Sequence, residues 1–152
     1  MQSALADKLM QFSSSHSSKI AEQWYKALST NTKTQAYKSM HRDACIRHAE
    51  CIYKNLEKLY FAESPESAVL HLLDVDGFVE DHYARSIPLE QVIYAIILLR
   101  RHLWLYAEIQ ALYDGVEDLL QMVENINRVL LVFDYLIFVA SSKYRLMQAQ
   151  SR

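Results

Sequence analysis

Among the residues that could do chemistry, the histidine at position 82 has the most unusual surroundings in this sequence. It shares a predicted helical stripe with Val75, Phe78 and Val79, and the turn-forming pair Ile87-Pro88 follows shortly after. A neutral imidazole on an apolar helix wall provides the basic nitrogen that a haem iron needs as axial ligand. We therefore interpret His82 as a candidate metal ligand. The remaining histidines are interpreted as surface or structural residues: His16, His41, His48, His71 and His102.

The sequence lacks the motifs of common catalytic sites. With only two glycines it has no phosphate-binding loop, dinucleotide fingerprint or Gly-x-Ser-x-Gly turn. The run from Asp74 to Gly77 lacks the spaced oxygens of a calcium loop, and the adjacent Glu80 and Asp81 point to different sides of a helix. We expect a protein that is not itself an enzyme. A small enzyme would need a convergent polar pocket, which the sequence does not reveal.

Composition favours a single all-α domain over residues 1–152. The chain is 51% hydrophobic, enough to bury a core, and it has only two glycines and two prolines. A β-sandwich or barrel needs many more turn residues than this. Cys45 and Cys51 lie six residues apart on a predicted helix and point to different faces, so no disulfide is expected between them.

Charge and hydropathy argue against nucleic-acid and membrane partners. The net charge is -2, which gives no electrostatic basis for binding phosphates. The longest apolar runs, 92–99 and 129–140, are shorter than the roughly 20 residues that a bilayer requires. The first residues lack the basic start and apolar core of a secretory signal. A cytoplasmic location is therefore expected.

The first half of the chain is predicted to form several short helices. The first ends at the serine-rich run 13–18, the second covers 20–28, and 29–34 is a polar connection. The apolar stripe from Tyr37 to Leu59 is interpreted as a short helix that leads into another near Asp43.

The second half begins with a clear helix-start signal. Ser64 can cap a helix and is followed by Pro65 and Glu66, so we predict a helix from there to about Arg85, kinked at Gly77. Another helix is predicted from Pro88 to about Tyr113. The apolar stripe of the first of these two helices is Ala68, Leu72, Val75, Val79 and His82.

The last predicted helix, from residue 116 to about 147, has the strongest periodicity. Apolar residues recur in steps of three and four, which predicts a coiled-coil-like seam; they are Val116, Leu119, Val123, Ile126, Leu130, Phe133, Ile137, Ala140, Tyr144 and Met147. Around 129–139 the other faces are apolar too, which favours a homodimer through helices 88–113 and 116–147. The alternative is a central helix wrapped by its own chain.

Several segments together carry a family resemblance. The run 82–92, continuing to 98–103, resembles the proximal-histidine segment of the globin-coupled sensors, particularly the globin domains fused to diguanylate cyclases. His82, Ile87 and Pro88 match the spacing of that segment. Upstream, residues 23–26 resemble the aromatic-tyrosine pair of the family's second helix, and 125–129 resemble the start of the dimerising part of its last helix.

This resemblance implies a globin-like fold round a haem b pocket. It makes His82 the iron ligand, with its other ring nitrogen hydrogen-bonded to a carbonyl or a hydroxyl group, for which Ser86 is a candidate. It places the hydroxyl of Tyr25 on the distal side, where it would hydrogen-bond to bound oxygen. Ile46 would form an apolar distal wall. The proximal side would be packed by Phe78, Val79, Val92 and Ile96.

The function implied is that of a homodimeric sensor of O2 or another diatomic gas. The signal would pass from His82 through Ile87-Pro88 into the helix of residues 92–105 and from there to the last helix. It would then reach an output such as a diguanylate cyclase, fused or separate. The chain departs from the family at Ser86, where a glycine is usual, and its arginine, Arg85, stands one place late. The alternative is a haem-free, globin-like regulatory and dimerisation module, as in a related set of bacterial stress-signalling regulators.

Overall fold

The computed structural model describes residues 4–151, and the expected all-α fold is confirmed: this part of the chain contains helices and no strands. The helices are α1 (Ala4–Ser15), α2 (Ser17–Thr30), the 3-10 helix η1 (Thr32–Ser39), α3 (Arg42–Lys54), α4 (Leu56–Tyr60), α5 (Pro65–Asp76), α6 (Phe78–Ala84), α7 (Leu89–Leu105), α8 (Ala107–Asp114) and α9 (Leu119–Gln150). No described helix is both long and apolar enough to cross a bilayer.

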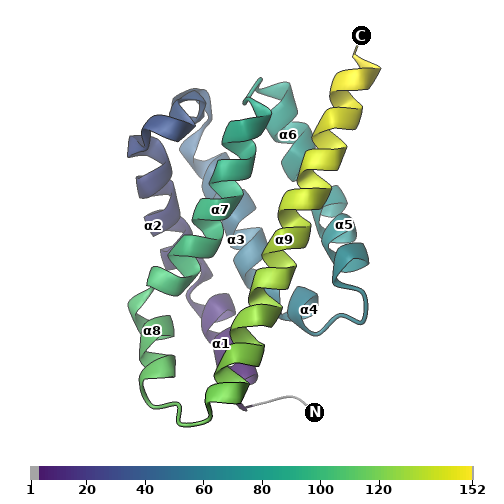
Figure 1. Ribbon diagram of the computed structural model, residues 1–152. Coiled ribbons are helices and arrows are strands. Elements are labelled where there is room, and N and C mark those ends of the chain that lie inside the picture. Colours follow the sequence, from purple (N-terminus) through teal and green to yellow (C-terminus); the bar gives the residue numbers. More distant parts are fainter. Residues whose placement is uncertain (1–3, 152) are drawn as a thin grey trace.

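Two long antiparallel helices, α7 and α9, lie side by side and organise the molecule (Figure 1). The helices α2 and α3 pack on each other, and α2 also packs on α7. On the other side, α5 and α6 pack against α9, which runs along the whole length of the molecule. The core thus lies between the α7–α9 pair and the shorter helices that precede it.

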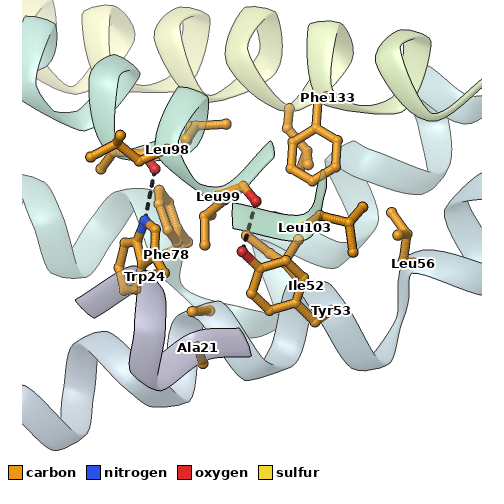
Figure 2. Close-up of a cluster of buried hydrophobic side chains, with 14 of the residues drawn as sticks. Ala21, Trp24, Ile52, Tyr53, Leu56, Phe78, Leu98, Leu99, Leu103 and Phe133 are labelled. Carbon is orange, nitrogen blue, oxygen red and sulfur yellow. Dashed lines mark hydrogen bonds between the residues drawn. The ribbon is translucent and has the colours of Figure 1, made fainter. Parts of the chain in front are cut away.

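Buried aromatic side chains fasten α7 to the helices behind it (Figure 2). The indole nitrogen of Trp24, on α2, donates to the carbonyl oxygen of Ala95 at 3.0 Å. The hydroxyl of Tyr53, on α3, donates to the carbonyl oxygen of Leu99 at 2.7 Å. Each ring buries a large apolar surface while its polar atom keeps a partner, so these bonds fix the position of α7.

Several predicted helix ends are confirmed by cap contacts. Ser64 caps α5, accepting a hydrogen bond from the backbone nitrogen of Ser67, with Pro65 in the first turn as predicted. The predicted break near Asp43 is also present, since α3 begins there with His41 as its cap. Gly77 does more than kink a helix: with φ of 73°, it ends α5, and α6 starts after it.

The predicted helix from Pro88 to Tyr113 is wrong in its length. The chain leaves helical geometry at Tyr106, which has φ and ψ of -67° and 127°, and this residue separates α7 from α8. The ring of Tyr106 is buried, with its centroid 5.5 Å from that of His16. A contact between segments so far apart leaves no local signal in the sequence, and no glycine or proline stands at the break. The end of α7 was therefore not predicted.

Two predicted apolar stripes are only partly buried. Val75 is 72% exposed, so it does not belong to the buried stripe of His82; Val69 and Leu73 are the buried apolar residues of α5. In α9 the predicted seam is buried only at Phe133, Ala140 and Tyr144. The rest of the seam is partly or largely exposed: Val116, Leu119, Val123, Ile126, Leu130, Ile137 and Met147.

Candidate functional site

His82 projects from α6 into the core. Its side chain is 1% exposed, and its ring stacks on that of Phe78, one turn earlier, with 4.2 Å between centroids. Its Nδ1 lies 2.7 Å from the carbonyl oxygen of Phe78. Because a carbonyl oxygen only accepts, the proton must be on Nδ1, and Nε2 then carries a free lone pair.

The surroundings of His82 keep the ring neutral. Burial lowers the pKa of His82 to about 4; the bond to Phe78 opposes this shift, and the positive charge of nearby His48 adds to it. At neutral pH the imidazole is therefore uncharged, and Nε2 carries no proton. The partner of Nδ1 is a carbonyl oxygen, one of the two kinds of group expected, but it belongs to Phe78 and not to the candidate Ser86.

Three aromatic rings enclose the imidazole, and we call the set Tyr37, His48, Phe78 and His82 the His82 cluster. The ring of Tyr37, from η1, meets that of His82 edge-on with 5.5 Å between centroids. The ring centroid of His48, from α3, lies 5.6 Å from that of His82, and the ring of His48 meets that of Phe78 edge-on. The sequence alone places Tyr37 only in an apolar stripe and His48 among the ordinary histidines. It links neither to His82, because neither is at helical spacing from it.

Two polar atoms of this cluster have no hydrogen-bond partner among the described residues. They are Nε2 of His82 and the hydroxyl oxygen of Tyr37, and a water-sized sphere has almost no access to either. Leaving such a group unpaired in a protein interior costs about 1–3 kcal/mol. The unpaired atoms thus make the cluster a costly arrangement, of a kind often found at functional sites.

The His82 cluster suits a haem iron in its chemistry but not in the space around Nε2. Nε2 of His82 has the chemistry of an axial ligand, and its Nδ1 bond to a carbonyl is the kind of outer contact that orients metal-bound histidines. The space does not fit, however, because no water-sized space adjoins Nε2 and the rings of Tyr37, His48 and Phe78 all contact that of His82. As packed, these residues do not accommodate a macrocycle.

His48 forms a second polar centre beside His82. Its Nδ1 lies 2.6 Å from a carboxylate oxygen of Asp76 and its Nε2 2.7 Å from one of Asp81. Because ionised carboxylates only accept, both ring nitrogens carry protons and the ring is an imidazolium. Burial opposes this charge, but the two carboxylates raise the pKa of His48 above its usual value. Asp81 also accepts from Arg85 at 2.9 Å.

The other predicted pocket residues are buried or half-buried in the described chain. Tyr25 is half-buried on α2, with its ring centroid 5.9 Å from the guanidinium of Arg42, and it is not among the rings that contact His82. Ile46 is buried on α3. The predicted proximal residues are all buried in the core: Phe78, Val79, Val92 and Ile96.

Three surface pockets of the described chain lie away from His82. Surface pockets of about 260, 380 and 480 Å³ open elsewhere on the described chain, and His82 lines none of these three. Over residues 4–151 no group of three or more His, Cys, Asp or Glu side chains is placed to hold a metal ion. Both cysteines are free, as expected.

Ser86, at the position where the resemblance leads us to expect glycine, has a backbone conformation that favours glycine. Its φ is 59°, a left-handed conformation that costs a non-glycine residue about 1–2 kcal/mol. Replacing Ser86 with glycine removes this strain but gives the unfolded chain more freedom. We therefore expect Ser86→Gly to raise the free energy of unfolding in urea by about 0.5–1 kcal/mol.

A matched serine shows whether that gain comes from backbone strain. Ser14 is exposed and lies within α1, where glycine costs about 1 kcal/mol relative to alanine. Ser14→Gly should therefore lower the free energy of unfolding. Equal effects of the two substitutions would contradict the argument.

Comparisons with known proteins do not identify this chain. No protein-family model, no curated protein and no solved structure matches it. Its function has to be argued from its own residues.

Proposed function

We propose that this chain is a haem-free helical regulatory module that forms a homodimer along α7 and α9 and passes a signal to an output protein or domain. The close packing of the His82 cluster carries the haem-free part of this proposal. The ring where a sensor globin would bind iron is instead surrounded by the protein's own side chains.

Apolar surface along α9 supports the dimer. Val123, Leu130 and Ile137 are seven residues apart and so lie along one line of the helix, and none is buried. Phe138, one step round from Ile137, is 59% exposed. Large exposed side chains continue this surface at the first turn of the helix, at Leu119 and Leu120. Monomeric proteins rarely leave so much connected apolar surface uncovered.

Charged residues favour a second copy of this chain as the occupant of that surface. Asp134 is exposed among the apolar residues of α9, and Arg100 is half-exposed on the neighbouring α7. Over the described residues neither forms an ion pair within its own chain. In a twofold dimer, Asp134 of each copy can meet Arg100 of the other, because such an interface uses the same patch twice.

A charge placed on this surface tests the dimer. We expect wild type to sediment as a dimer and Ile137→Glu as a monomer with unchanged helix content, because the half-exposed side chain would bury a carboxylate in the interface. Phe133→Glu is unsuitable, since Phe133 is fully buried within the chain. The control is Val75→Glu, at an exposed position on α5. A monomeric wild type, or a dimeric Ile137→Glu, would contradict the proposed interface.

A haem-based gas sensor is the second candidate, favoured by the unpaired Nε2 of His82. That atom would hold the iron, and haem would supply reversible binding of a diatomic gas. Tyr37, rather than Tyr25, is the phenol in ring contact with His82. For this function the ring of Tyr37, His48 or Phe78 must move away from Nε2. Absorption spectra with added haem separate the two candidates.

A further inference from the structure

The short helix α6, which carries Phe78 and His82 of the His82 cluster, packs on α9 near the C-terminal end of that helix (Figure 1). One side of α6 carries the buried residues Phe78, Val79 and His82. Its Asp81 bonds to His48 of α3 at 2.7 Å. Any rearrangement of the His82 cluster therefore acts directly on α6.

Residues of α5, of α6 and of the turn after α6 contact the C-terminal part of α9. Lys143 of α9 forms ion pairs with Asp74 of α5 and, at 3.1 Å, with Glu80 of α6. The hydroxyl of Tyr144 donates to the carbonyl oxygen of Ile87, just after α6. These contacts fasten the part of α9 that includes residues 143 and 144 to α6 and its neighbours.

Tyr83 adds a third connection between α6 and α9. Its ring meets that of Tyr144 edge-on, with 5.3 Å between centroids, and its hydroxyl donates to Oγ of Ser151 at 2.6 Å. The connections from α6 thus extend over the last two turns of α9. They involve an ion pair, a ring contact and hydrogen bonds, so no single substitution removes all of them.

Both ends of α6 have left-handed backbone. Gly77 precedes it with φ of 73°, and Ser86 follows it with φ of 59°. Helical hydrogen bonds do not continue regularly through such residues, so α6 is a short separate helix between α5 and α7.

We infer that α6 is a lever that transmits a rearrangement of the His82 cluster directly to the last turns of α9. The unpaired Nε2 of His82 and hydroxyl of Tyr37 make the packed cluster a costly state, which a second arrangement can relieve. This route does not need α7, along which the signal was expected to pass from Ile87-Pro88. It also holds whatever the proposed function turns out to be, because it concerns only contacts within one chain.

Hydrogen exchange measured along α9 tests the lever. We expect His82→Phe, in the full chain, to speed exchange of the amides at 141–150 roughly tenfold, and those at 125–134 by less than about twofold. In a Lys143→Met/Tyr144→Phe background, which removes two of the connections, adding His82→Phe should cause little further change at 141–150. Phe78→Leu, which alters the ring stacked on His82, is the second perturbation if His82→Phe does not fold.

Two results would overturn the inference. One is equal exchange at 141–150 in wild type and His82→Phe, which would show that the cluster does not act on the end of α9. The other is an increase of the same size along all of α9, or one that persists unchanged in the Lys143→Met/Tyr144→Phe background. Either pattern would mean general loss of stability rather than transmission through α6.

Discussion

Replacing His48 with phenylalanine is expected to lower the free energy of unfolding by about 3–5 kcal/mol, the cost of breaking a buried ion pair by removing one partner. The imidazolium of His48 is fully buried between Asp76 and Asp81, and the side chain of Asp76 is only 7% exposed. Without His48 that carboxylate has no positive partner. Urea unfolding followed by circular dichroism at pH 7 measures the loss.

Removing the carboxylates as well separates lost charge pairing from lost packing. The triple variant His48→Phe/Asp76→Asn/Asp81→Asn leaves no uncompensated charge, so it should recover much of the stability lost in His48→Phe. Arg85 then loses its contact with Asp81, but it is exposed enough to be hydrated. A triple variant less stable than His48→Phe would contradict an ionised His48 held by two carboxylates.

The free energy of unfolding is expected to fall on both the acid and the alkaline side of neutral pH, in an acid limb due to His82 and an alkaline limb due to His48. His82 has a pKa of about 4 in the folded chain against 6.5 in the unfolded chain, so the unfolded chain binds protons first as pH falls. Its contribution is present above pH 6.5 and is lost as pH falls to about 4. A shift of this size corresponds to about 3 kcal/mol.

The contribution of His48 has the opposite sign. Its pKa is raised by folding, so its stabilisation is complete below pH 6.5 and is lost as pH rises through the folded value. Urea unfolding measured from pH 4 to 9 should therefore show greatest stability near pH 6–7 from this pair. In His82→Phe the free energy of unfolding should fall less steeply as pH drops below 6.5. In His48→Phe it should fall less steeply as pH rises above 7. An acid limb of unchanged slope in His82→Phe would contradict a neutral, buried His82.

Local sequence signals predicted the all-α fold and several helix boundaries. Ser64-Pro65-Glu66 predicted the start of α5, whereas Gly77 was predicted only as a kink in a helix running to about Arg85. With φ of 73° it ends α5 instead. The break at Tyr106 was not predictable in this way. It depends on burial of the ring against His16, some 90 residues earlier in the chain.

The candidate site was predicted in two residues of one helix, His82 and Phe78, but not in the residues that other helices contribute. The apolar neighbours of His82 in its own helix indicated a buried, neutral ring, and the ring is buried. Its neighbours Tyr37 and His48 come from other helices, and Asp76 and Asp81 follow His48 by 28 and 33 residues. No spacing rule joins such positions, since tertiary packing alone brings them together. For the same reason the sequence indicated a ligand for iron without indicating how tightly the ring is enclosed.

The central claim, that the His82 cluster is closed to haem, is tested most directly by an absorption spectrum. Purified protein is incubated with haem, freed of excess and recorded beside His82→Ala. We predict no Soret band beyond that of loosely associated haem, and the same spectrum for both proteins. A sharp, stoichiometric Soret band in wild type that His82→Ala abolishes would contradict the claim and favour the gas sensor.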